Sequence, residues 1–204
     1  MRSLRAFCVI VAVTGMADRC LAADPRYPDW PCAQAKVPEI SLAAVWNGPA
    51  LDDATNKWRD NPKISPLVAR LAARRTPLDQ AEKEIVGFLQ ETPSEKAERG
   101  KLVFAGLFET LNAERTAVIN GLERTTSKQR EAAEKVRSDT VGLQSLQNQP
   151  TKDQTRIDEL SNQLIWETRI FEDRRRVIKF VCEVPTAIDQ RLFGLARIIQ
   201  QEME

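Results

Sequence analysis

The sequence predicts an all-α protein built around a long antiparallel helical hairpin, a coiled-coil stalk that rises from a helical bundle. Residues 94–147 contain no proline, and their apolar residues recur at alternating spacings of four and three. A stop signal at 148–150 ends this helix, and a second apolar repeat of equal length follows it to the end of the chain. The alternating β-branched runs joined by tight turns that mark a sheet are missing.

Residues 1–22 have the pattern of a secretory signal peptide. Arg2 and Arg5 precede an apolar run over 6–17, and small residues lead to an expected cleavage after Ala22. The run is shorter than the roughly twenty residues that a membrane-spanning helix needs. We therefore expect a periplasmic or secreted protein that does not span a membrane after signal cleavage.

Charge and composition exclude several function classes. The signal peptide removes three arginines and one aspartate from 30 basic and 29 acidic residues, so 27 basic and 28 acidic residues remain. A balanced charge gives no reason to expect nucleic acid or an anionic membrane as a partner. The chain has no histidine, which removes the commonest general base and most zinc, copper and non-haem iron sites. We therefore predict no catalytic residue, no cofactor, no metal and no enzymatic activity.

A carboxylate-based hydrolase is the enzyme class that remains open. The acids available for it are Asp52 and Asp53, Glu172 and Asp173, and Glu202. Adjacent acids on a helix point about 100° apart, and each has arginines or lysines nearby. The expected environment of these acids is a solvated surface.

Two cysteines remain after signal cleavage, Cys32 and Cys182. In an oxidising compartment they predict one disulfide, although free or intermolecular thiols are an alternative. Closing a loop of this length stabilises a fold by about 5 kcal/mol in the chain-entropy model.

Residues 23–66 hold most of the prolines and three of the four tryptophans. Proline fixes the backbone away from the helix, so we expect an extended strap with short helices near 41–46 and 51–60. The rest of the chain, 67–204, is expected to form the bundle and its protruding hairpin.

The strap tryptophans are large enough to anchor it to the bundle. They are Trp30, Trp46 and Trp58. Core packing is the expected role, and a ligand pocket between strap and bundle is the alternative.

Two helices are predicted before the long one, over 66–75 behind Ser65 and over 77–91 behind Thr76. Their apolar stripes need a surface to cover. We expect it on the return arm, where a second stripe comprises Trp166, Ile170, Val177, Val181 and Val184.

The long helix is expected to begin at Ser94 behind a capping Thr92. Its apolar seam is interrupted at four positions that face the partner helix. These are Arg115, Thr125, Gln129 and Asp139.

The return arm is predicted to start behind a capping Thr151 and to run to Glu204, with a new start at Thr186. A tight tip near 148–151 makes paired residue numbers sum to about 298, which places Val181 level with Ala117. The polar residues of 123–140 and 158–175 indicate a thin two-helix stalk.

The candidate interaction residues lie on the return arm. They are Trp166, Ile165, Ile170, Arg174 and Arg175. Trp166 is either core or an exposed contact residue, depending on how far the early helices reach. The leading hypothesis is a non-enzymatic exported protein whose hairpin binds an envelope protein or a second copy of the chain. The alternative is a periplasmic carrier of a small molecule or metal ion, with its site between the bundle and the aromatic strap.

Overall fold

The computed structural model describes residues 24–51 and 53–204, so the predicted signal peptide and Asp52 lie outside the described residues. Over these ranges the chain forms helices and no strand, which confirms the all-α class. The elements are α1 (Leu42–Val45), α2 (Ala54–Lys57), α3 (Ile64–Ala72), α4 (Leu78–Gln90), a 3₁₀ turn η1 (Pro93–Glu95), α5 (Lys96–Gln147), α6 (Gln154–Val181) and α7 (Val184–Met203).

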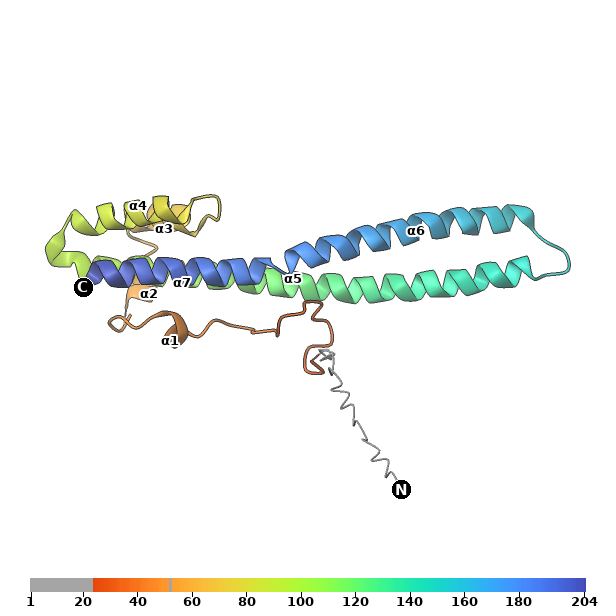
Figure 1. The fold of residues 1–204 in the computed structure, drawn as a ribbon, viewed down its shortest axis with the longest axis horizontal. Helices are drawn as coiled ribbons and strands as arrows, with labels where there is room; N and C mark the ends of the chain where they lie inside the picture. The colour runs from red at the N-terminus through yellow and green to blue at the C-terminus, as the bar shows by residue number, and fades with distance from the viewer. Residues whose placement is uncertain (1–23, 52) are drawn as a thin grey trace, which may run out of the picture.

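The longest helix, α5, runs the length of the molecule (Figure 1). Helix α7 lies beside its first half and α6 beside its second half, so the return arm consists of two helices. The break falls at Cys182 and Glu183, two residues before Pro185. Proline is tolerated in the first turn of a helix, and there it belongs to α7. The predicted new start at Thr186 is therefore two residues too late.

The helix starts differ from those that the hydroxyl residues predict. Helix α3 begins at Ile64 because the Asn61 side chain accepts from the backbone N–H groups of Lys63 and Ile64, at 3.0 and 3.2 Å. Ser65 lies inside the helix. Thr76 does not cap α4; its hydroxyl donates to the carbonyl of Arg70 at 2.9 Å.

The predicted caps of the two hairpin helices are also wrong. The Thr92 hydroxyl accepts from Arg99 at 2.8 Å, and the chain passes through η1 before α5 begins. At the hairpin tip, Asp153 caps α6 by accepting from the N–H of Arg156 at 3.0 Å. Thr151 remains outside the helix.

The late start of α6 changes its register relative to α5. Lys135 bonds to Glu167 and Gln163 bonds to Asp139, and both pairs of residue numbers sum to 302. The predicted sum of 298 is therefore wrong by four residues, about one helical turn or 6 Å along the arm. The cause is the turn, which takes residues 148–153 out of the helix where a tight reversal was expected.

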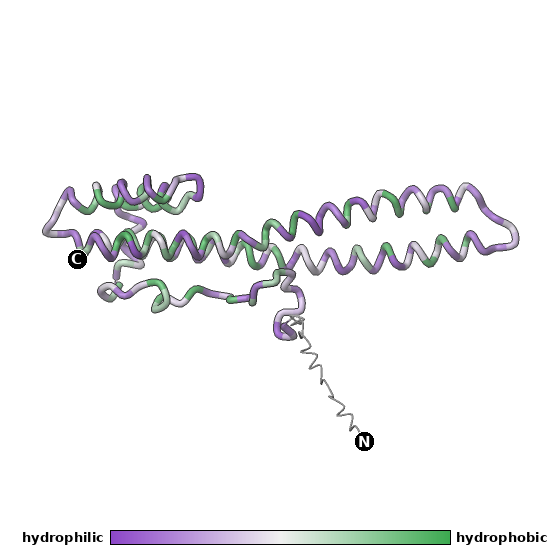
Figure 2. Tube along the Cα trace, viewed as in Figure 1, coloured by the Kyte–Doolittle hydropathy of each residue, from purple (hydrophilic) through white to green (hydrophobic). Residues whose placement is uncertain are grey.

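One hydrophobic core joins α3, α4, α7 and the first part of α5, with contributions from α1 and α2. Its fully buried large side chains are Ile64, Val68, Leu71, Ile85, Leu89, Phe104, Leu107, Leu111, Ile188, Leu192, Leu195 and Ile199. Helix α6, all of whose residues are described, contributes none to this core. Figure 2 shows the same division, with hydrophobic residues frequent in the bundle and hydrophilic ones frequent toward the hairpin tip.

The early helices do not cover the stripe on the return arm that was expected to receive them. They pack instead on α5 and α7, at the end of the molecule away from the hairpin tip (Figure 1). At that end α7 is apolar on more than one side, which suits a helix held between neighbours. The α6 side chains Trp166, Ile170 and Val177 stay exposed.

Gly106 marks a close approach of the early segments to α5. A Cβ built at this glycine would lie 2.7 Å from Val68 Cγ2 and 2.9 Å from the ring of Trp58. Glycine therefore lets α2 and α3 pack directly on the backbone of α5.

Arg115, one of the four seam interruptions, is a buried tie between three segments. Its side chain is 4% exposed. Its Nε donates to Asp189 of α7 at 2.7 Å, and its Nη1 donates to the carbonyls of Val37 at 2.6 Å and Pro38 at 3.3 Å. The residue that interrupts the apolar seam thus holds the N-terminal segment against α5 and α7.

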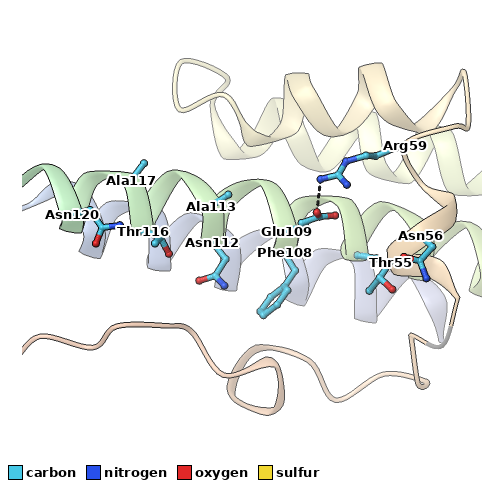
Figure 3. Close-up of a pocket in the computed structure, with 11 residues that line it drawn as sticks. Thr55, Asn56, Arg59, Phe108, Glu109, Asn112, Ala113, Thr116, Ala117 and Asn120 are labelled. Atoms are coloured by element: carbon cyan, nitrogen blue, oxygen red, sulfur yellow. Dashed lines mark hydrogen bonds and ion pairs between the residues drawn. The ribbon is translucent and has the colours of Figure 1, made fainter.

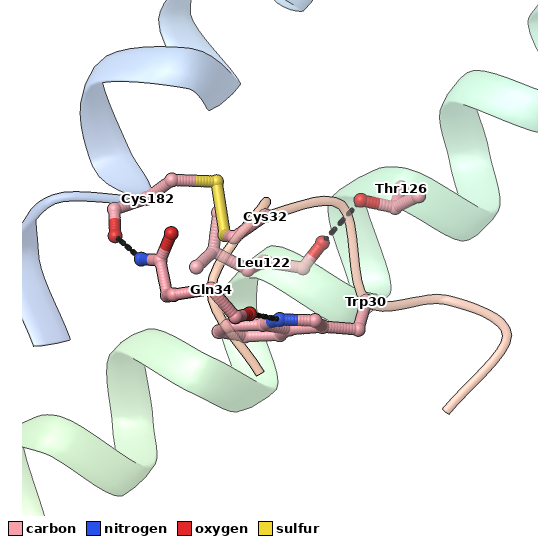
Figure 4. Close-up of a disulfide and its surroundings, with 6 residues drawn as sticks. All are labelled: Trp30, Cys32, Gln34, Leu122, Thr126 and Cys182. Carbon is pink, nitrogen blue, oxygen red and sulfur yellow. Dashed lines mark hydrogen bonds between the residues drawn. A yellow bond between two sulfur atoms is a disulfide. The ribbon is translucent and has the colours of Figure 1, made fainter. Parts of the chain in front are cut away.

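The Cys32–Cys182 disulfide lies where the two cysteines predict it, with a Cα–Cα distance of 5.5 Å. It joins the N-terminal segment to the break between α6 and α7 (Figure 4). The Gln34 amide donates to the carbonyl of Cys182, and the Trp30 indole donates to the carbonyl of Gln34 at 2.7 Å. This arrangement fixes the base of α6. None of the described helices is long and apolar enough to cross a membrane.

Candidate interaction surface

Four large apolar side chains lie exposed along one face of α6. They are Trp166, Ile170, Val177 and Phe180, and we call them the α6 stripe. Their exposed fractions run from 47% for Ile170 to 71% for Phe180. At about 100° per residue they fall within about 80° of one another around the helix, over a length of about 21 Å. The structure thus decides the position of Trp166, which is 62% exposed.

The stripe is large for an exposed feature of a single chain. Trp166 and Phe180 together expose roughly 250–300 Å², taking ordinary aromatic side-chain areas. With Ile170 and Val177 the total enters the range of the largest apolar patches on monomers, which are often functional.

The other predicted interaction residues, Ile165, Arg174 and Arg175, lie outside this stripe at different positions around α6. Ile165 is 66% exposed but lies about 100° away from Trp166, on the side of the helix. Arg174 borders the stripe. Arg175 points to the opposite side of α6, where it lies 3.7 Å from Glu172 and lines a cleft beside the disulfide.

Arginines border both edges of the stripe. The guanidinium of Arg169 lies 5.9 Å from the centre of the Trp166 ring. Arg176, on the same edge, contacts Asp173 at 2.9 Å, and Asp173 lies in the middle of the stripe. No acid of the described chain contacts Arg174 on the other edge. The face is therefore apolar along its centre except at Asp173, and basic along both sides.

Helix α6 is held to α5 by polar contacts and by apolar side chains that are mostly half-buried, such as Leu160 and Phe171. The Gln129 amide donates to the Phe171 carbonyl at 2.9 Å. Lys135 of α5 donates to Asp139 and Glu167, each at 2.6 Å. These hydrogen bonds, the one to Asp139 first and the one to Glu167 second, raise the pKa of the Lys135 ammonium. Only one α6 side chain is buried, that of Ile157 near the tip, so the opposite face is available for other contacts.

Phe180 is the stripe residue that the sequence analysis did not single out. It follows Trp166 by fourteen residues and Val177 by three, which is the spacing of one helical face. The signal was present in that spacing. Phe180 was not predicted to belong to this face because residues beyond 175 were expected to lie in the bundle.

A cleft of about 540 Å³ lies beside the disulfide, between the N-terminal segment, α5 and α6. Its walls include Pro31, Phe171 and Ile178, and Arg175 and Lys179 also line it. Gln129 lines it too and is 7% exposed; its Oε1 finds no hydrogen-bond partner among the described residues.

A second groove, of about 700 Å³, lies between α2 and α5 (Figure 3). It is lined mainly by neutral residues, with the ion pair of Arg59 and Glu109 at one side. None of the strap tryptophans lines this groove or the disulfide cleft. Trp46 stacks on Phe104 at 4.0 Å, and Trp58 is buried with its indole donating to Glu109 at 2.9 Å.

The acids considered for a hydrolase are dispersed. Asp53 lies 3.1 Å from Lys57, and Glu172 and Asp173 contact arginines of their own helix. Over residues 24–51 and 53–204, no three His, Cys, Asp or Glu residues gather in a group that could hold a metal ion.

Comparison with known proteins gives no match, whether to a family model, to a curated protein or to a solved structure.

Proposed function

We propose that this chain is a non-enzymatic exported protein that binds another protein through its hairpin, and that the α6 stripe is the contact surface. In this proposal α5 and α6 form a coiled-coil stalk. The bundle, the N-terminal strap and the disulfide hold the stalk at its base.

One observation carries the proposal: four large apolar side chains are exposed on one face of a helix that adds nothing to the core. Exposed apolar clusters of this size mark interaction sites, and aromatic residues dominate the binding energy of such sites. The polar contacts of α6 to α5 and its buried or half-buried apolar side chains are made by residues outside the stripe, so the stripe is not required for folding.

The test compares two exposed apolar residues of the hairpin. The variant is Trp166→Ala, and the matched control is Val141→Ala, because Val141 is 65% exposed on α5 outside the stripe. Both proteins, with the disulfide intact, are cross-linked in native envelope extract and recovered by pull-down. We expect the Trp166 variant to lose its specific cross-links, since a tryptophan that acts as a binding hot spot contributes about 2–4 kcal/mol at an interface.

The control variant is expected to keep those cross-links. Equal recovery of the same partners by both variants and by the unchanged protein would contradict the proposal. Size-exclusion chromatography with light scattering shows whether any complex contains a second copy of the chain.

Export is part of the proposal, and its support is the single disulfide, since disulfides persist in oxidising compartments. Mass spectrometry of the protein recovered from the periplasm or medium is expected to give an N-terminus at Ala23. A chain that keeps residues 1–22 and stays with the cytoplasmic fraction would refute export.

A second candidate function is favoured by the cleft beside the disulfide. Its apolar walls and its two cations, Arg175 and Lys179, suit a small amphipathic anion. Thermal shift with decanoate is the first test. Stabilisation that disappears in Arg175→Gln/Lys179→Gln, and persists in the exposed control Arg137→Gln, would support a carrier function; no stabilisation of the unchanged protein would reject it for this ligand class.

A further inference from the structure

We propose that the partner of the α6 stripe is an acidic amphipathic helix of another protein, and not a second copy of this chain. The inference rests on the proposed function and names the chemistry of the partner.

The shape of the stripe fits a helix. Its members are spaced at i, i+4, i+11 and i+14 from Trp166, which is the pattern by which one helix presents an apolar seam to another. Its length of about 21 Å corresponds to about four helical turns of a partner.

The charge beside the stripe indicates which polar residues a partner helix would carry. Arg169 and Arg176 lie on one edge and Arg174 on the other. The one acid within the stripe, Asp173, already contacts Arg176 at 2.9 Å. A partner helix that carries Glu or Asp beside its apolar seam would pair with these arginines on both edges.

The same charges oppose self-association. In an antiparallel pair each edge of a helix meets the same edge of its copy, so Arg169 would face Arg176 and Arg174 would face itself. In a parallel pair the edges exchange, and the arginines of one edge face Arg174. Both arrangements bring arginines together across the seam, and this repulsion disfavours a second copy of the chain as the partner.

An offset antiparallel pair does not escape this problem. Sliding the copies until Glu159 lies opposite Arg176 places Val177 and Phe180 opposite the polar residues Asp158 and Thr155. The apolar contact that would drive the association is then lost.

The experiment uses two synthetic amphipathic peptides with the same leucine seam, one with Glu and one with Lys at the flanking positions. Fluorescence anisotropy measures their binding to the full oxidised chain. We expect the Glu peptide to bind at least about tenfold more tightly than the Lys peptide, and its binding to weaken as salt rises from about 50 to 500 mM.

Charge reversal in Arg169→Glu/Arg174→Glu is expected to invert the preference between the peptides. The matched control is Arg137→Glu, an exposed arginine of α5 whose side chain is 72% exposed, and it is expected to keep the original preference. Circular dichroism checks that each variant retains its helix content.

Each other outcome overturns a distinct claim. Equal binding of both peptides, or of neither, overturns the acidic partner while the proposed function stands if Trp166→Ala still removes the native cross-links. A dimer of the chain that Trp166→Ala dissociates shows that the second copy is the occupant. Cross-links that survive Trp166→Ala remove the proposed function and this inference together.

Discussion

Replacing Arg115 by methionine tests whether a buried charged tie holds the N-terminal segment to the bundle. Methionine keeps the length and most of the volume of the side chain, so little of the expected cost comes from a cavity. The variant loses the bond to Asp189 and the bonds to the carbonyls of Val37 and Pro38.

The magnitude follows from the burial of each partner. A hydrogen bond to a charged group contributes about 1.5–3 kcal/mol, and breaking a buried ion pair costs about 3–5 kcal/mol. The Asp189 side chain is 32% exposed, so water can solvate it after the change. The cost of breaking this ion pair is therefore smaller than for a fully buried pair. We expect a loss of about 2–4 kcal/mol in the free energy of unfolding.

The assay is urea unfolding of the oxidised protein, followed by circular dichroism. Arg130→Met is the matched control, because Arg130 also joins α5 to the N-terminal segment, through Asp29, but its side chain is 55% exposed. Exposed pairs contribute about 0–1 kcal/mol. A loss below about 1 kcal/mol for Arg115→Met, or equal losses for both variants, would refute the reasoning.

Two further predictions concern the disulfide and the glycines. Replacing Cys32 and Cys182 by serine is expected to lower the free energy of unfolding by up to about 5 kcal/mol, because the unfolded chain loses its constraint; denaturation with and without reductant measures it, and identical midpoints for the unchanged protein would contradict it. Gly106→Ala is expected to cost about 1–3 kcal/mol, since its methyl group meets the side chains of Val68 and Trp58. Gly87→Ala, which meets nothing within 4 Å in α4, is expected to stabilise by up to about 1 kcal/mol; thermal unfolding compares the two, and a Gly106 variant as stable as the Gly87 variant would count against the packing argument.

The sequence predicted those features that depend on periodicity and on pairs of residues. Apolar spacing located every helix of eight residues or more among the described residues. Setting aside the two cysteines of the predicted signal peptide left one possible intramolecular disulfide. The sequence was less informative about where helices begin. Hydroxyl residues before proline indicated caps at Ser65 and Thr76, yet Asn61 supplies the first cap and Thr76 bonds backward to Arg70. Several side chains a few residues apart can cap the same helix, and local propensity does not show which of them will do so.

The candidate surface was predicted in part for a similar reason. Trp166 and Ile170 were recognised as an apolar face, but their exposure depended on where α3 and α4 pack, which is a tertiary property. The register shift of four residues came from the length of the turn at the hairpin tip. Neither quantity can be read from the spacing of one helix, because both depend on contacts between segments far apart in the chain.

The separation of the α6 stripe from the hydrophobic core has a consequence for variation. Residues of a packed interior constrain one another, so a change in one usually requires a change in another. This constraint does not apply to the α6 stripe, because none of its residues, 166, 170, 177 and 180, belongs to the hydrophobic core. Under the proposed function, their identities can drift toward new binding preferences while the fold keeps its stability, so recognition and folding would evolve independently on this scaffold.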